Sequence, residues 1–171
     1  MKKNALQTER LLLTPIEPGD VPFLLALLRE EAVRKYLCDD QIIEQDAVRG
    51  FVEQSQALFS TEAGIGLWLL RSLPVQEPVG LCGFLQGDDL EILYVVGSAY
   101  TGRGLATEAS RAVLERFQNN GQTADILAVI DRPNLSSHFV ARKLGAEQIG
   151  TRANPTTGEE MSVYRIPPHS P

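Results

Sequence analysis

The sequence predicts a single α+β domain built on a mixed, mostly antiparallel sheet with one parallel βαβ crossover. Three observations lead to this fold class. Segments with β-type and helical spacing of apolar residues mix along the chain, and three β-like segments in its middle are separated only by short turns. A β-like run, a glycine turn, a helical run and a second buried β-like run then follow in order, which is the pattern of a parallel crossover.

The N-terminal part of the chain predicts one strand followed by two amphipathic helices. Arg10 to Ile16 is a β-rich apolar run that ends in a proline- and glycine-containing turn. Asp20 is then suited to cap a helix that tolerates Pro22 in its first turn. Apolar residues recur at helical spacing over 23–36 and again over 47–59, and each stretch is expected to be one helix.

The middle of the chain predicts an antiparallel meander and then the crossover. The meander consists of three segments, Ile65–Arg71, Val79–Leu85 and Leu90–Val96. After the glycine turn, a helical pattern ends at Gly121, a residue type that commonly terminates helices. Ile126 to Ile130 is expected to be the buried parallel strand.

The C-terminal part predicts a last helix over Asn134–Leu144 and two strands near Gln148–Thr151 and Met161–Ile166. The helix has four apolar residues at helical spacing, namely Leu135, Phe139, Val140 and Leu144. With 171 residues and 43% hydrophobic composition, the chain has the size of one globular domain. We therefore expect one domain over 1–171 that ends in a loose tail over 167–171.

Composition excludes several classes of function. A formal charge of -6 disfavours direct binding of nucleic acid and suits cationic substrates. Cys38 and Cys82 form no CxxC pair, so neither a zinc site nor a disulfide framework is expected, and a reducing cytoplasm fits. No apolar stretch approaches the length that spans a bilayer, so we expect a soluble protein without membrane contact or bound metal.

The glycine turn is the strongest chemical signal in the sequence. Gly102 to Thr107 reads GRGLAT, follows a predicted strand and opens a predicted helix, where unpaired amides and the positive helix end bind anions. Glycine allows positive φ and close approach of a phosphate. A plain strand-to-helix turn is the alternative. A dinucleotide site is a weaker alternative, because Thr107 replaces the third glycine of that motif, although Asp131 follows the next strand.

Three stretches together resemble one family. They are the opening run with Thr8 to Leu13, the segment from Glu91 to Ala109 (EILYVVGSAYTGRGLATEA) and the segment from Asn134 to Gly145 (NLSSHFVARKLG). In order and spacing they resemble the GNAT acetyltransferase superfamily, in the branch that is similar to the RimJ and RimL ribosomal-protein alanine N-acetyltransferases. The resemblance spans nearly the whole chain and implies a splayed sheet that parts between the strands Leu90–Val96 and Ile126–Ile130.

The resemblance also implies acetyl-CoA as the acetyl donor, bound largely through the backbone. Pantetheine would lie in the splay and pyrophosphate on the glycine turn. The implied cofactor residues are Tyr94, Val95, Val96, Thr101, Gly102, Arg103, Gly104, Leu105, Ala106, Thr107, Asn134 and Ser137. The chain departs from the family pattern at Thr101, where Gln, Arg or Trp is usual, and at Ser98 and Ala99, where a proline is common. Neither departure removes a backbone donor.

Acetyl transfer needs a base for the amine and an acid for the leaving thiolate. The resemblance suggests Glu91 as general base, acting directly or through water, and a solvated strand-end glutamate is the alternative. Ser137 is the candidate acid or sulfur contact, with a buried hydroxyl bonded to a preceding carbonyl as its alternative. Asn134 either caps the helix, contacts the cofactor or does both. The tyrosine that many relatives use as acid falls at Ala141.

The remaining polar and aromatic candidates are assigned mainly to structure. His138, Tyr100 and Trp68 are expected to pack, with catalysis, lining of the cofactor loop and lining of the substrate pocket as their respective alternatives. Glu108 is expected to serve its helix or a neighbour. Among the cations that could meet the cofactor phosphates, Arg103 is placed ahead of Arg142 and Lys143. The implied activity is acetyl transfer to a primary amine, either a protein N-terminus or a small molecule, and the resemblance allows a homodimer. A non-catalytic acyl-CoA-binding domain is the rival function.

Overall fold

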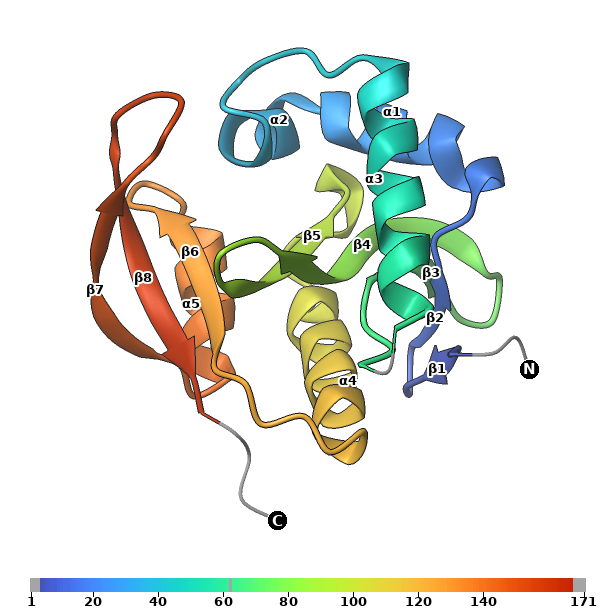
Figure 1. Ribbon diagram of the computed structural model, residues 1–171. Helices are drawn as coiled ribbons and strands as arrows, with labels where there is room; N and C mark the ends of the chain where they lie inside the picture. Colours follow the sequence, from blue (N-terminus) through green and yellow to red (C-terminus); the bar gives the residue numbers. More distant parts are fainter. Residues whose placement is uncertain (1–3, 62, 168–171) are drawn as a thin grey trace.

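The computed structural model describes residues 4–61 and 63–167, which form one mixed sheet with helices on both faces (Figure 1). The strands run in the order β1-β2-β3-β4-β5-β6-β8-β7. Their bounds are β1 Leu6–Gln7, β2 Leu11–Pro15, β3 Leu67–Ser72, β4 Glu77–Gln86, β5 Leu90–Val96, β6 Ile126–Asp131, β7 Glu147–Ala153 and β8 Glu160–Ile166. The α-helices are α1 Val21–Arg29, α2 Glu31–Leu37, α3 Gln45–Phe59, α4 Leu105–Asn119 and α5 Leu135–Lys143.

The sheet confirms the predicted topology. Strands β3 to β5 pair antiparallel in sequence order, which is the meander expected from the short turns. Strands β2 and β1 extend it antiparallel beyond β3, and the short strand β1 was not predicted. Strand β6 returns parallel to β5 after α4, and β8 and β7 then extend the sheet in antiparallel pairs. The described chain is therefore an α+β fold with one parallel crossover.

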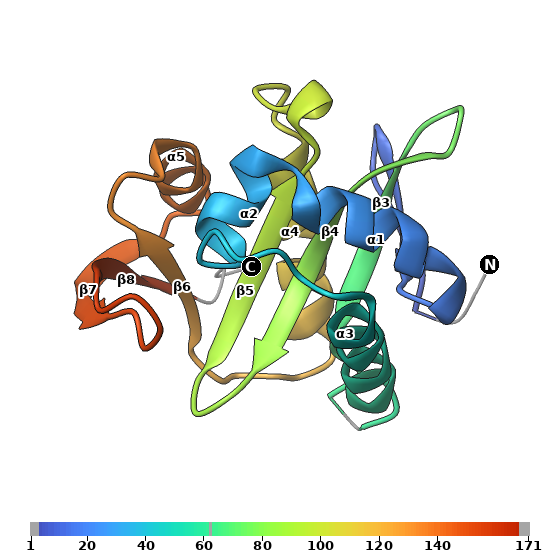
Figure 2. The ribbon, with the colours of Figure 1, turned by 90° about the horizontal axis from the view of Figure 1, so that it is seen from above.

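Each face of the sheet has its own apolar core. Helices α1, α2 and α3 lie on one face and α4 lies on the other (Figures 1 and 2). Strand alternation sends Leu67 and Leu69 of β3 to the α1–α3 face and Trp68 to the α4 face. Trp68 is fully buried, packs edge-on against Phe59 at 4.6 Å between ring centroids, and donates its indole N–H to the Asn4 carbonyl. The expected packing role of Trp68 is confirmed.

The predicted N-terminal helices require two corrections. The expected helix over 23–36 is two helices, because Glu30 leaves the helical conformation (φ −56°, ψ 130°) between α1 and α2. Asp20 does not cap α1 with its side chain. Its carboxylate instead accepts a hydrogen bond from the Glu17 amide at 2.9 Å and pairs with Arg71 of β3 at 3.1 Å. Asp20 thus closes the turn that precedes α1 and forms a tertiary ion pair with β3, and it does not cap α1.

The predicted last helix is present, but its apolar spacing matches the buried face only in part, because Leu144 and Val140 pack in the core and the other two apolar residues do not. Leu135 and Phe139 of α5 are 66% and 61% exposed, whereas His138 and Ala141 are buried. The His138 ring contacts the Tyr164 hydroxyl at 2.9 Å and the Arg132 carbonyl at 3.2 Å, and these partners allow an imidazole to be buried. His138 therefore packs, as expected, and the buried face of α5 includes it.

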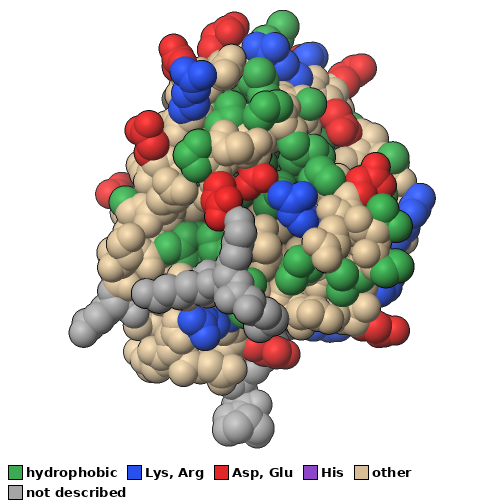
Figure 3. All heavy atoms as spheres, turned by 90° about the vertical axis from the view of Figure 1, so that its right-hand side faces the viewer, with side chains coloured by type: hydrophobic (Ala, Val, Ile, Leu, Met, Phe, Trp, Pro, Cys, Tyr) green, Lys and Arg blue, Asp and Glu red, His purple; other side chains and the backbone are tan. Residues whose placement is uncertain are grey.

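The surface facing the viewer in Figure 3 carries basic, acidic and apolar side chains interspersed, without one continuous basic area. Within the described residues, no helix is both long and apolar enough to cross a bilayer. No group of three or more His, Cys, Asp or Glu side chains in that same part of the chain is arranged to hold a metal ion. Of the predicted loose tail, residues 168–171 lie outside the described residues.

Candidate active site

The site begins where the two parallel strands part. Strands β5 and β6 pair at only two positions in the described chain, Leu90 with Ile126 and Glu91 with Leu127. From Ile92 onward β5 pairs with β4 alone, so its β6-facing backbone groups are available to a ligand. The expected splay between these two strands is confirmed.

The glycine turn lies at the same end of β5 and opens α4. Gly102 and Gly104 both have φ of 78°, the left-handed conformation that glycine adopts without strain. Within the described residues, no amide from Gly102 to Thr107 donates a hydrogen bond, and the amide of Glu108 is the first to bond the Gly104 carbonyl. The turn therefore presents free N–H groups at the positive end of a helix.

A cavity of about 520 Å³ joins the splay to the glycine turn. All the predicted cofactor residues line it except Arg103. The wall also includes residues that the sequence did not assign to the cofactor site, on α2, β6 and α5. These are Ala32, Val33, Tyr36, Leu37, Val129, Asp131 and Phe139. The cavity thus passes through the sheet, from the start of α4 to the side covered by α2.

The predicted phosphate cations are differently placed. Arg103 donates to the Ala99 carbonyl at 2.9 Å and lies over the Tyr100 ring, so its guanidinium folds back onto its own loop. Arg142 lies over the Phe139 ring, and only Lys143 of the three lines the cavity. The backbone of the turn is consequently better placed than the side chain of Arg103 to meet an anion.

The start of α5 faces the splay. Asn134 Oδ1 accepts the Ser137 amide at 3.2 Å, so the expected cap is present. Tyr94 of β5 donates its hydroxyl to the Ser137 carbonyl at 2.9 Å, which ties α5 to the splayed strand. Burial chiefly raises the pKa of Tyr94, and a hydrogen bond with the Ser137 side chain partly opposes this rise, so the phenol stays neutral. Ser137 lines the cavity, and its hydroxyl lies within hydrogen-bond reach of the Tyr94 hydroxyl.

Glu91 lies near the cavity and does not line it. Alternation along β5 puts Glu91 on the same face as Leu93 and Val95, both of which do line it. Its carboxylate is held in an ion pair by Arg152 of β7, which also approaches Asp89 at 3.5 Å. The Glu91 side chain is 26% exposed and paired, so it is neither a deeply buried base nor a freely solvated glutamate.

A second carboxylate, at the end of β6, was missed by sequence reasoning about catalysis. Asp131 lines the α2 side of the cavity. Burial raises the pKa of Asp131, and the neighbouring charges of Asp39 and Glu159 raise it further. These three carboxylates come from separate segments, and the sequence contains no spacing that would bring them together. Asp131 gives this end of the cavity a negative potential suited to an ammonium group.

The residues present fit an acyl-CoA. The open space around Gly102, where a Cβ would meet nothing within 4 Å, leaves room for a phosphate beside the free amides. The unpaired edge of β5 offers the amide and carbonyl groups that a pantetheine chain can pair with.

Comparison with known proteins agrees with this geometry. The family model for the acetyltransferase (GNAT) domain matches residues 10–147. An uncharacterized protein of Bacillus subtilis, YkkB, is 30% identical over 149 residues, covering 84% of this chain and 85% of that protein. A putative GNAT-family acetyltransferase from Bordetella pertussis has a similar structure, with TM-score 0.81 and 25% identity over 95% of this chain and 99% of that one.

The ribosomal L7/L12 acetyltransferase RimL, solved in complex with coenzyme A, shares the fold with TM-score 0.78 and 18% identity, covering 98% of this chain and all of that one. The fold is that of a GNAT acetyltransferase domain. This chain belongs to the GNAT acetyltransferase family.

Proposed function

We propose that this protein transfers the acetyl group of acetyl-CoA to a primary amine, by direct attack of the amine in a ternary complex. The observation that carries the proposal is the cavity in which the free amides of the glycine turn, the unpaired edge of β5 and the start of α5 face one another. Acetyl-CoA supplies the activated thioester when bound, and the protein supplies binding, orientation and proton transfer.

The backbone holds the donor in this proposal. The amides from Gly102 to Thr107 bind the pyrophosphate, and the backbone of Tyr94, Val95 and Val96 pairs with the pantetheine amides. The oxygen that develops negative charge during attack requires a nearby N–H donor. The unpaired β5 edge offers such donors along the cavity.

Two side chains handle protons. Glu91 accepts the proton of the amine directly or through one water, and Arg152 fixes the orientation of its carboxylate. Ser137 relays a proton to the departing thiolate and recovers one from water, and Asn134 holds the first turn of α5 in place through its cap. Asp131 attracts the cationic amine toward the α2 side of the cavity.

The acceptor is either a protein N-terminus, as the likeness to RimL-type folds supports, or a small-molecule amine. The net charge of -6 and the carboxylate of Asp131 suit a cation in both cases. We place the reaction in the cytoplasm, because the free thiols of Cys38 and Cys82 suit a reducing compartment.

A non-catalytic acyl-CoA-binding domain is the second candidate, favoured by the engagement of Glu91 with Arg152 outside the cavity wall. The deciding experiment follows release of CoA from acetyl-CoA with a panel of amines and N-terminal peptides. We expect turnover with at least one acceptor, and a kcat about 10² to 10⁴ lower in Glu91→Gln with unchanged acetyl-CoA binding. Glu53→Gln, on the exposed face of α3, is the matched control.

Binding of acetyl-CoA without CoA release from any acceptor would favour the non-catalytic domain. Failure to bind acetyl-CoA would contradict both candidates.

A further inference from the structure

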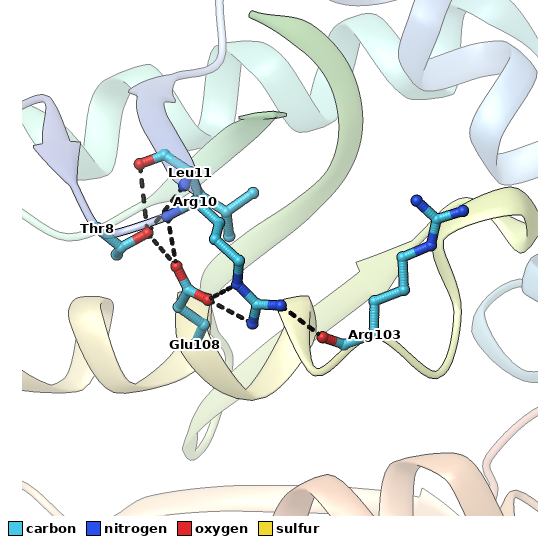
Figure 4. Close-up of polar contacts among 5 residues, drawn as sticks. All are labelled: Thr8, Arg10, Leu11, Arg103 and Glu108. Carbon is cyan, nitrogen blue, oxygen red and sulfur yellow. Dashed lines mark hydrogen bonds and ion pairs between the residues drawn. The ribbon is translucent and has the colours of Figure 1, made fainter. Parts of the chain in front are cut away.

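An ion pair joins the N-terminal segment to the first turn of α4, across 98 residues of sequence (Figure 4). The Glu108 carboxylate accepts from Arg10 Nε at 2.7 Å and from the Arg10 amide at 3.0 Å, and Arg10 Nη2 lies 2.6 Å from it. Thr8 donates its hydroxyl to the same carboxylate at 2.6 Å. With four contacts on one carboxylate, the Arg10 side chain is fixed more firmly than in a typical surface ion pair.

The ionised state of Glu108 supports this arrangement. Its side chain is 18% exposed, against 47% for Arg10. Burial alone would raise the pKa of Glu108, but the hydrogen bonds from Thr8 and from the backbone and side chain of Arg10 together lower it. The carboxylate is therefore charged at neutral pH and balances the charge of Arg10.

The far end of the Arg10 guanidinium reaches the glycine turn. Its Nη1 donates to the carbonyl oxygen of Arg103 at 2.9 Å, as Figure 4 shows. The peptide unit between Arg103 and Gly104 is planar and trans, so its C=O and N–H point in opposite directions. A carbonyl fixed toward Arg10 consequently fixes the Gly104 amide in the direction away from Arg10.

The turn needs such a restraint. Gly102 and Gly104 are separated by one residue, and glycine loses more conformational freedom on ordering than any other residue. Ordering of the turn when the anion binds would weaken affinity, unless the turn is already held in the binding conformation.

We propose that Arg10, oriented by Glu108 and Thr8, is a positioning residue that holds the glycine turn in the conformation that binds the CoA pyrophosphate. The proposal rests on the proposed function, because it assigns the turn to CoA. Since the charge of Arg10 is balanced by Glu108, its contribution comes from the orientation of a peptide plane and not from direct attraction of phosphate.

Arg10 could act on CoA as a free charge or by position, and these two roles predict opposite effects of Glu108→Gln on CoA affinity. If Arg10 acted as a free charge, removal of the Glu108 carboxylate would strengthen CoA binding, because a negative group near the helix start would be lost. If Arg10 acts by position, the same substitution releases the guanidinium and weakens binding.

The test is titration calorimetry of CoA with the full chain and four variants, each checked for folding by its melting temperature without ligand. We expect Arg10→Ala to weaken CoA binding about tenfold, the worth of one charge-assisted hydrogen bond, and Glu108→Gln to weaken it several-fold. The CoA affinity of Arg10→Lys should lie between those of wild type and Arg10→Ala, because an ammonium lacks the planar set of donors with which a guanidinium binds a carboxylate and a carbonyl at once. Arg49→Ala is the control, since Arg49 is an exposed cation paired to Asp46 on α3.

An Arg10→Ala affinity within twofold of wild type, or tighter binding by Glu108→Gln, would overturn the proposal. If Arg10→Ala does not fold, Arg10→Lys and Glu108→Gln decide the matter by the same criteria. Wild-type protein that does not bind CoA at all would instead contradict the proposed function, so the two failures are distinguishable.

Discussion

Alanine substitutions at the two ends of α4 separate backbone strain from ligand binding. Gly104 precedes the helix with φ of 78°, and Gly121 follows it with φ of 74°. An added Cβ at Gly104 would meet only Arg10 Nη2, at an ordinary 3.6 Å, and at Gly121 it would meet nothing within 4 Å. Both substitutions therefore act through the left-handed conformation, which costs an L-residue about 1 to 2 kcal/mol.

The cost appears in different measurements at the two positions. Urea unfolding, followed by the fluorescence of the buried Trp68, gives the free energy of unfolding with and without CoA. Gly121→Ala should lose about 1 to 2 kcal/mol in both conditions and bind CoA as the wild type does. With saturating CoA, the free energy of unfolding of Gly104→Ala should fall by at least as much. Without CoA the turn can relax and relieve part of the strain, and that part should then appear as weaker CoA affinity.

Either of two results would refute a special role of Gly104 in CoA binding. One is a Gly104→Ala protein whose unfolding free energy with CoA matches that of wild type. The other is a Gly121→Ala protein that loses CoA affinity as strongly as Gly104→Ala, because a common loss would show that the glycine turn has no special relation to the ligand.

Three further predictions concern titratable groups. Asp131→Asn should raise the KM for the amine acceptor several-fold and leave acetyl-CoA affinity unchanged in calorimetry. A change in acetyl-CoA affinity without a change in the KM for the amine would contradict the role of Asp131 in attracting the amine. The pKa of Glu108 is lowered in the folded protein, so its ionised carboxylate stabilises the fold fully above the ordinary pKa of 4.5. This stabilisation is lost as the pH falls through the lower folded pKa. In urea titrations, the difference in unfolding free energy between wild type and Glu108→Gln should therefore shrink in that acidic range. Burial raises the pKa of Cys82 to about 12, so a thiol reagent at pH 8 should label at most Cys38 in the native protein and both thiols after denaturation, and two rapid labels in the native state would refute the burial of Cys82.

Local sequence patterns predicted those parts of the fold whose cause is local. Short turns predicted the meander, and Gly121 predicted the end of α4. The glycine turn was found because helix-opening glycines act through their own backbone conformation, with φ of 78° at Gly102 and Gly104.

The missed features depend on contacts between distant segments. The break at Glu30 accompanies hydrogen bonds from the amide and hydroxyl of Ser98, 68 residues away, to the Glu30 carboxylate. The buried face of α5 depends on Tyr164, which satisfies the His138 ring from β8. Apolar periodicity cannot register either partner, since it counts only neighbours along the chain.

The candidate site likewise has parts that contiguous motifs predict and parts that depend on contacts between distant segments. The family resemblance located most of the cavity wall, because its motifs are contiguous segments at the start of α4 and α5. It could not locate Asp131 as part of the α2 side, or show that Arg152 holds Glu91, because β7 and α2 reach the site only through the tertiary fold.

The separation of β5 from β6 links the stability of the folded protein to its ligand. Two residue pairs hold the five-stranded part of the sheet to the three-stranded part along that seam. A ligand whose amides pair with the β5 edge would act there as a substitute strand and would add its binding energy to the folded state alone. If acetyl-CoA is that ligand, the resistance of the protein to unfolding and proteolysis would rise and fall with the supply of acetyl-CoA.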